Sequence, residues 1–166
     1  SLCSKISSFS ILDVGCGLGH LYGFLKDQGF IKKYKIDYTG YDISPKLLEV
    51  AKKKYPEAKF DLKDILIDRI SQRFDYVFCS GVFNLLLTDE IEHGRYVKEM
   101  ILKMYELCKE GVAVNFLSIS GIYLVPERGE GELNKYYYYK PEEILSFVRS
   151  FSTRFVLRQD YHPGDF

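Results

Sequence analysis

The chain has 166 residues, of which 46% are hydrophobic and 28% are charged. These proportions exclude a disordered tail, and the length suits a single domain with one core, predicted over residues 1–166. The 23 basic side chains equal the 23 acidic ones, so the formal net charge is zero. Because a protein that neutralises many phosphates normally has a basic excess, the charge gives no support to a nucleic-acid partner.

The sequence shows no sign of a membrane-spanning helix, a signal peptide or a disulfide framework. No apolar run approaches the roughly 18 residues that a membrane-spanning helix needs, so no membrane association is expected. Residues 1–5 lack the apolar core of a signal peptide. The four cysteines are widely spaced, without a C-x-x-C pair, which argues against a disulfide framework or a zinc site. A reducing compartment, the cytoplasm, is therefore expected, while the oligomeric state stays open.

Strand-like and helix-like segments alternate in the first half of the chain. A short apolar run at residues 9–14 ends at a cluster of glycines. Apolar residues at helical spacing then predict a helix over 18–28, with Gly29 as its C-terminal cap. The next predicted segments are a strand over 35–41, a helix that begins at Ser44 and Pro45, and a strand over 58–62. This alternation is typical of a parallel α/β sheet.

The second half continues the alternation but contains one irregular stretch. A run over 75–80 predicts a buried central strand, because it is continuously apolar after its first residue. The longest helix is predicted over 89–109, with Gly111 closing it. A strand over 112–117, a helix over 141–151 and a last strand over 154–160 are also predicted. Residues 118–140 contain no clear element, and connections of this length are usually functional or disordered.

A glycine-rich turn follows the first strand and opens the first helix. It contains Asp13, Gly15, Gly17 and Gly19. Glycines permit a sharp turn at positive φ and leave space for a ligand against the main chain. The dinucleotide fingerprint G-x-G-x-x-G/A fails in both frames, because His20 or Tyr22 would replace its third glycine, and no Walker loop is present. The turn therefore predicts a ligand of another class.

The run ILDVGCGLG at residues 11–19 resembles the first motif of class I S-adenosylmethionine-dependent methyltransferases, [ILV]-L-D-x-G-C-G-x-G. Three further elements follow in the family's order: Asp42 after the second strand, Asp64 after the third, and an F-D-x-[VI] segment at 74–77. The resemblance runs from about residue 9 to residue 118. It implies a Rossmann-like three-layer α/β/α sandwich with a mostly parallel sheet. The elements that the family has at both ends are not found here; truncation at both ends is the preferred interpretation, and a shorter sheet is the alternative.

The resemblance also implies a site for S-adenosylmethionine, with S-adenosylhomocysteine as product. In the family, the second-strand carboxylate binds the ribose hydroxyls and the third-strand one lies near the adenine amino group. Asp13 would hold the glycine loop or contact the amino group of the ligand. The implied cofactor-binding residues are Asp13, Gly15, Cys16, Gly17, Gly19, Asp42, Ile43, Asp64, Ile65, Cys79 and Gly81.

The methyl acceptor is less defined. Methyl transfer to such an acceptor is an in-line displacement that depends mainly on alignment, so a base is not obligatory. No base is assigned, because His20, His93 and His162 are scattered, and no spacing suits a metal. A small-molecule acceptor is slightly favoured by the zero net charge, with nucleic acid or protein as open alternatives. A non-catalytic cofactor-binding module and, less favoured, a nicotinamide-dependent oxidoreductase are the alternative functions.

Two features near the predicted sheet edge have competing interpretations. Asn84 could orient a polar group of the substrate, but a role in a turn is preferred. The run of four tyrosines at 136–139 could form an aromatic wall, since aromatic faces attract cations. The preferred interpretation is a strand whose tyrosines alternate between core and solvent.

Overall fold

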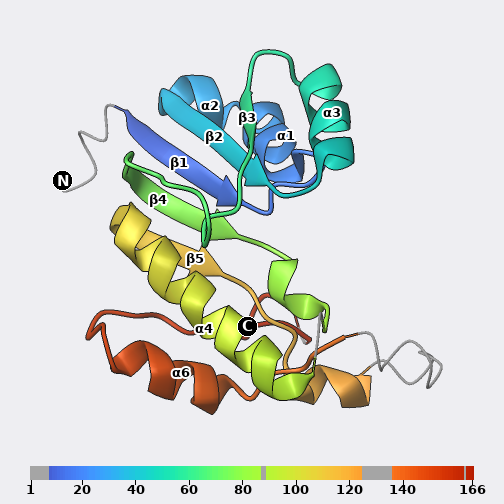
Figure 1. Ribbon diagram of the computed structural model, residues 1–166, viewed down its shortest axis with the longest axis vertical. Helices are drawn as coiled ribbons and strands as arrows, with labels where there is room; N and C mark the ends of the chain where they lie inside the picture. Colours follow the sequence, from blue (N-terminus) through green and yellow to red (C-terminus); the bar gives the residue numbers. More distant parts are fainter. Residues whose placement is uncertain (1–7, 87–88, 125–135, 163) are drawn as a thin grey trace. The chain divides into compact units, whose positions relative to one another are not determined.

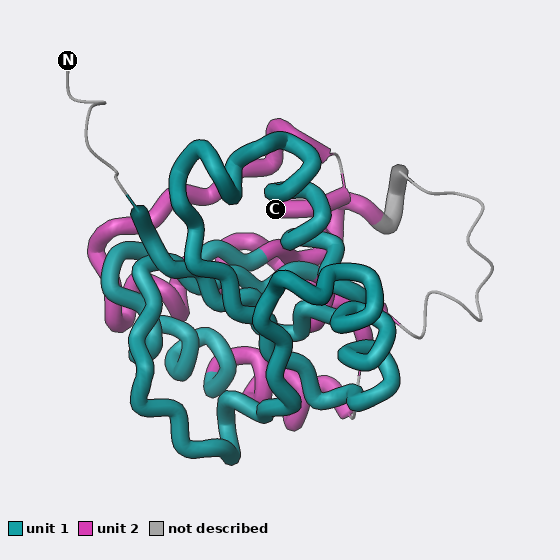
Figure 2. Tube along the Cα trace, turned by 90° about the horizontal axis from the view of Figure 1, so that it is seen from above, with its two compact units in different colours: residues 1–80, 99–114 teal, residues 81–98, 115–166 magenta. Residues whose placement is uncertain are grey.

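The computed structural model describes residues 8–86, 89–124, 136–162 and 164–166. The chain divides into two compact units (Figure 2). Unit 1 comprises residues 1–80 and 99–114, and unit 2 comprises residues 81–98 and 115–166. The predicted parallel sheet lies in unit 1, whereas unit 2 contains most of the C-terminal third of the chain.

Among the described residues, unit 1 is built on a five-stranded parallel sheet in the order β3-β2-β1-β4-β5 (Figure 1). The chain order reverses at β1, which pairs with both β2 and β4. Ligands of open α/β sheets bind at such a switch point, beyond the carboxyl ends of the strands. This topology confirms the predicted Rossmann-like α/β class. The strands are β1 (Phe9–Val14), β2 (Ile36–Asp42), β3 (Lys59–Leu62), β4 (Phe74–Cys79) and β5 (Cys108–Val114).

Three helices of unit 1 lie beside β1, β2 and β3 (Figure 1). They are α1 (His20–Asp27), α2 (Phe30–Lys33) and α3 (Pro45–Lys54). Ser44 caps α3 as predicted, because its side chain accepts a hydrogen bond from the backbone N–H of Leu47. A buried cluster joins these helices to the strands: Ile11, Cys16, Tyr22, Ile36, Tyr38, Leu48, Ala51 and Phe60.

Unit 2 has an aromatic core. Phe83 and Phe116 are fully buried, and their rings stack with centroids 5.5 Å apart. The backbones of Phe116 and Phe166 exchange two hydrogen bonds, of 2.9 and 3.0 Å. Its elements are η1 (Val82–Asn84), η2 (Ile119–Leu124), α6 (Pro141–Arg149) and the first half of α4 (Glu90–Leu107), a helix whose second half belongs to unit 1.

The boundary predicted between the longest helix and the following strand is wrong. The helix ends at Leu107, and β5 begins at Cys108, so that Gly111 lies inside the strand and caps nothing. Cys108 pairs in register with Phe74 of β4. Pairing with β4 outweighs the helical pattern at this point, because strand formation depends on neighbours that the local sequence does not contain.

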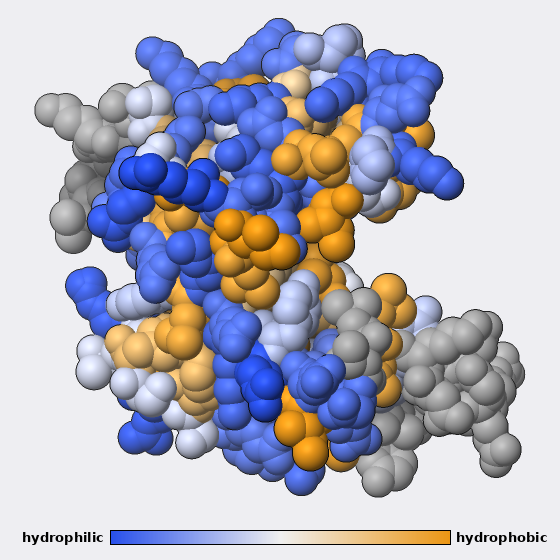
Figure 3. Space-filling view, viewed as in Figure 1, coloured by the Kyte–Doolittle hydropathy of each residue, from blue (hydrophilic) through white to orange (hydrophobic). Residues whose placement is uncertain are grey.

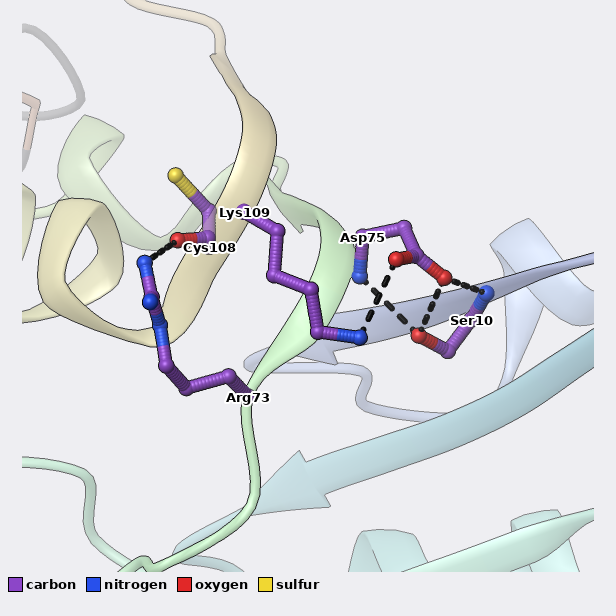
Figure 4. A network of polar contacts seen from close by, with 5 residues as sticks. All are labelled: Ser10, Arg73, Asp75, Cys108 and Lys109. Carbon is purple, nitrogen blue, oxygen red and sulfur yellow. Dashed lines mark hydrogen bonds and ion pairs between the residues drawn. The ribbon is translucent and has the colours of Figure 1, made fainter.

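A polar network joins the beginnings of three strands (Figure 4). The Asp75 carboxylate accepts hydrogen bonds from the backbone N–H and the hydroxyl of Ser10, and forms an ion pair with Lys109 at 3.1 Å. These bonds hold the pKa of Asp75 below its usual range, with the Ser10 bonds as the main cause. The Arg73 guanidinium donates to the Cys108 carbonyl. The network lies at the amino-terminal ends of the strands, at the edge opposite the glycine turn, and it ties the three strands together.

Two predictions near the C-terminus are also corrected. Residues 154–160 form no strand, because no described segment pairs with them. The tyrosine run makes only isolated bridges, Leu85 with Tyr136 and Ser118 with Tyr139. In the stretch predicted to lack clear elements, η2 covers part of 118–140, and residues 125–135 lie outside the described residues.

The exterior is mainly hydrophilic on the face shown in Figure 3, with hydrophobic residues gathered in several places. Within the part of the chain that the structure describes, no helix has the length and apolar character needed to cross a membrane.

Candidate functional site

The glycine-rich turn is held by the end of β2. Gly15, Gly17 and Gly19 have φ of 69°, 53° and 76°, in the left-handed region that favours glycine. The backbone N–H groups of Gly15 and Cys16 both donate to the Tyr41 carbonyl, at 2.8 and 3.0 Å. The N–H of Gly17 donates to Oδ2 of Asp42 at 2.8 Å. The structure therefore brings the glycine turn and the β2 carboxylate together, as the resemblance implied.

The glycines of the turn have different surroundings. A Cβ added at Gly17 would meet nothing within 4 Å, so open space borders the main chain there. A Cβ at Gly19 would lie 2.9 Å from the Phe60 ring and 3.1 Å from the Tyr55 ring. Gly17 thus leaves space that a ligand can occupy, whereas Gly19 allows the turn to pack against the core.

Both carboxylate oxygens of Asp42 accept backbone hydrogen bonds. Its Oδ2 accepts the bond from Gly17, and its Oδ1 accepts one from the backbone N–H of Ser44 at 2.8 Å. Only 8% of the residue is exposed. Each carboxylate oxygen can accept a second hydrogen bond, so the group can hold the turn and still receive ligand hydroxyls.

Asp13 is bound to the neighbouring strand. The Tyr38 hydroxyl donates to its Oδ2 at 2.6 Å. Burial raises the pKa of Asp13 to about 7; the Tyr38 bond opposes the shift and the Asp42 charge adds to it. The N–H groups of the turn donate to the Tyr41 carbonyl and the Asp42 carboxylate. Among the described hydrogen bonds, the Asp13 carboxylate accepts its bond from Tyr38. Its contact with a ligand amino group stays a prediction.

The remaining predicted site residues of unit 1 are divided between surface and core. Ile43 follows Asp42 and is 71% exposed. Asp64 belongs to a turn, in which its Oδ1 accepts a hydrogen bond from Leu66 N at 2.9 Å. The side chains of Cys16, Ile65 and Cys79 are buried, which gives them a packing role at this edge.

Gly81 lies in unit 2. Its φ is 80°, and its N–H donates to Oδ1 of Asn115 at 2.9 Å. A Cβ at this position would also meet nothing within 4 Å.

Sequence reasoning missed the residues of β2 that shape the turn. Besides Tyr38 and Tyr41, Gly40 is essential to the packing, since a Cβ there would lie 2.8 Å from both Cys16 Sγ and the Phe60 ring. A glycine inside a strand signals close approach of another chain segment, and this signal was available in the sequence.

Unit 2 contains a second polar cluster. His93 is completely buried, and its Nε2 lies 2.7 Å from the Tyr139 hydroxyl, which donates to the Phe83 carbonyl at 2.7 Å. Since that hydroxyl has one proton, His93 donates through Nε2 and its Nδ1 is an acceptor. Among the described residues, His93 Nδ1 and Asn84 Oδ1 are buried without hydrogen-bond partners. Burial lowers the pKa of His93 and so favours the neutral ring.

The other two histidines are exposed, and the described residues contain no group of three metal-binding side chains that could hold an ion.

Two curated proteins resemble the chain in sequence. A protein of Mycobacterium tuberculosis described as a candidate methyltransferase is 32% identical over 111 residues, which cover 66% of this chain and 64% of the relative. Another of the same description, from Geobacillus sp., is 32% identical over 111 residues, covering 60% of this chain and 38% of the relative. The chain thus spans under two thirds of the length of the relatives it matches.

Solved structures show the same fold. The plantazolicin methyltransferase BpumL in complex with S-adenosylhomocysteine superposes with a TM-score of 0.68 at 20% identity, covering 86% of this chain and 55% of that protein. A TehB-like SAM-dependent methyltransferase from Corynebacterium glutamicum superposes with a TM-score of 0.55 at 24% identity, covering 86% and 64%. The family model for the methyltransferase domain matches residues 12–114, the part that contains the glycine turn and the whole sheet from Leu12 onward. The chain therefore belongs to the methyltransferase domain family.

Proposed function

We propose that the chain is an S-adenosylmethionine-dependent methyltransferase and that residues 1–166 act as one methyltransferase domain. The observation that supports this most directly is the pairing of open space at Gly17 with the Asp42 carboxylate, which binds the same turn. A ligand with a ribose can lie against the main chain at Gly17 and donate its hydroxyls to Asp42.

The apolar residues at this edge also fit the cofactor. Asp42 pairs in register with Leu62, the last residue of β3, which is 57% exposed. Ile43 is exposed as well, so two neighbouring strand ends offer apolar surface for the flat face of an adenine. Asp64 follows β3 and is the proposed partner of the adenine amino group. The proposed cofactor-binding set remains Asp13, Gly15, Cys16, Gly17, Gly19, Asp42, Ile43, Asp64, Ile65, Cys79 and Gly81.

The protein would contribute alignment and exclusion of water. S-adenosylmethionine, when bound, supplies an already activated methyl group. A structural neighbour crystallised with desmethyl-plantazolicin analogues, together with the zero net charge of this chain, supports a small-molecule acceptor. Among the described residues, Cys16 and Cys108 form no disulfide, which supports a reducing compartment such as the cytoplasm.

The test compares two alanine substitutions with the same backbone cost. Gly17 and Gly29 have φ of +53° and +70°, and a Cβ at either would meet nothing within 4 Å. Gly17→Ala and Gly29→Ala should therefore lose similar stability, about 1 kcal/mol, through strain in the left-handed region. Calorimetric titration with S-adenosylhomocysteine should show saturable binding to the wild type and to Gly29→Ala, and at least tenfold weaker binding to Gly17→Ala.

NADH is the negative control for this titration. Binding of NADH in place of S-adenosylhomocysteine would overturn the cofactor class. Equal affinity of the two variants would remove Gly17 from the site. Product formation in a methyl-acceptor screen then distinguishes a methyltransferase from a non-catalytic module.

A further inference from the structure

Unit 2 contains a cavity of ≈ 520 Å³. This volume is within the range of small-molecule sites. Its polar and aromatic lining consists of Glu90, Tyr136, Tyr137, Tyr138, Lys140 and Glu143, with two aliphatic residues completing the wall. The tyrosines belong to the run that the sequence predicted to be a strand.

The tyrosines of the cavity lining, Tyr136, Tyr137 and Tyr138, form its aromatic wall. Tyr137 is held in place by contacts with residues outside the cavity. The Tyr137 backbone N–H donates to the Asn84 carbonyl at 3.0 Å. The Tyr137 ring lies 4.8 Å from the His93 ring and 4.7 Å from the Tyr139 ring, measured between centroids. His93 and Tyr139 are themselves joined by their 2.7 Å hydrogen bond. Tyr137 is therefore held in place before any ligand arrives, which lowers the entropic cost of binding.

The cavity lining contains more acidic than basic side chains. Lys140 pairs with Glu143 at 3.3 Å. Among the described residues, Glu90 has no ion-pair partner, so the lining has an excess of one negative charge. Burial raises the pKa of Tyr137; the charges of Glu90 and Glu143 add to this shift, and the charge of Lys140 opposes it.

The negative charge of the cavity lining favours cations, and the N-terminus of α4 does not offset this preference. A helix N-terminus attracts anions through its free N–H groups. In α4 the Asp89 carboxylate accepts from the N–H groups of Ile91 and Glu92 at 3.0 and 3.1 Å. The donors that an anion would use are therefore already occupied by a charged side chain.

We propose that this cavity binds a small organic cation, a primary or secondary amine whose ammonium group lies at Glu90 and whose carbon frame packs on the tyrosines. Carboxylates and aromatic faces both attract ammonium groups. The inference goes beyond the proposed function, because the cavity is lined by residues of unit 2 alone.

The experiment uses three probes of nearly equal size and different charge: phenethylamine, neutral 2-phenylethanol and anionic 3-phenylpropanoate. Their affinities are measured by NMR titration of the full chain. Phenethylamine should bind at least fivefold more tightly than 2-phenylethanol, and 3-phenylpropanoate should bind most weakly. Equal affinities, or a preference for the anion, would overturn the proposal.

Two glutamate variants test whether Glu90 causes the preference for phenethylamine. Glu90→Gln should remove most of the preference for phenethylamine, a loss of about fivefold. Glu92→Gln is the matched control, because Glu92 lies in the same first turn of α4, is exposed and is outside the cavity lining. Unchanged amine binding by Glu90→Gln, with the thermal unfolding of both variants alike, would refute the assigned role of Glu90.

Titration of the same samples with S-adenosylhomocysteine separates the two proposals. Binding of S-adenosylhomocysteine without amine binding would refute the cavity proposal and leave the proposed function standing. Amine binding without S-adenosylhomocysteine binding would support the cavity as a cation site and refute the proposed function.

Discussion

The two units differ in how their buried polar groups are satisfied. In unit 1, Asp13 has the Tyr38 hydroxyl and Asp42 has two backbone N–H groups. In unit 2, among the residues that the structure describes, His93 Nδ1 and Asn84 Oδ1 are buried without partners. Satisfied networks hold one conformation, whereas a buried acceptor without a partner costs free energy that a ligand donor can recover. Unit 1 is thus a preorganised site, and unit 2 has unused hydrogen-bonding capacity.

The two units also respond to pH in opposite directions. The pKa of Asp13 is raised to about 7, so its contribution to stability is complete below its usual pKa of 3.8 and is lost as the pH rises through 7. The pKa of His93 is lowered from its usual 6.5. Its contribution is complete above 6.5 and is lost as the pH falls below that value.

The largest effect is expected when the Asp13 charge is removed. Asp13→Asn keeps an oxygen that accepts the Tyr38 bond and removes the buried charge. At pH 8 the variant should be more stable than the wild type by about 3 kcal/mol, and at pH 5, between the two pKa values of Asp13, this difference should shrink to less than half. Urea unfolding at both pH values measures this. A variant equally destabilised at both pH values would show that Asp13 is not a strained, buried charge.

Loss of the Asp42 carboxylate should have the next largest effect. Asp42→Ala leaves the N–H groups of Gly17 and Ser44 without their acceptor and should cost about 2 kcal/mol without any ligand. The exposed Asp37→Ala on the same strand is the control, expected within about 0.5 kcal/mol of the wild type. Thermal unfolding compares them. If Asp42→Ala matched Asp37→Ala in stability but lost S-adenosylhomocysteine binding, Asp42 would be a ligand-binding group only.

The smallest change in stability is expected when one tyrosine hydroxyl is removed from each unit, and this pair of variants compares the units directly. Tyr139→Phe leaves the Phe83 carbonyl and His93 Nε2 without their shared partner and should cost about 1 kcal/mol at pH 7 and above. Tyr38→Phe should cost more at pH 8 than at pH 5, because its hydroxyl stabilises the charged form of Asp13. Denaturant titrations at both pH values test this. The same pH dependence in both variants would contradict the difference between the units.

Much of the site's framework was predictable because its signals are local. The strand before the glycines, the Ser44 cap and the position of Asp42 all came from short stretches of sequence, and the structure confirms them. The partners of those residues were not predictable in the same way. Tyr38 and Tyr41 contact the turn only because β1 and β2 pair in register, and that register depends on the whole sheet.

The errors have the same cause. Residues 154–160 have strand-forming side chains, yet a strand requires a neighbour with free backbone groups, and no described segment provides one. Cys108 continues the helical spacing of apolar residues in the preceding segment, yet its pairing with Phe74 places it in β5. In the tyrosine run, Tyr139 is buried against His93, while Tyr136, Tyr137 and Tyr138 line a cavity, so neither simple interpretation describes all four.

Sequence patterns were sufficient to predict the family resemblance, the order of strands and helices through the glycine turn, and the residue types at the ends of β1, β2 and β3. These are properties of short segments, in which glycine conformation, capping and hydrophobic period act over a few residues. Only the tertiary structure decided that Asp42 holds the turn, that Gly17 borders open space, and that three tyrosines form a cavity wall with Glu90. Those properties depend on distances between residues far apart in the chain, and distances of that kind are fixed by packing and strand register.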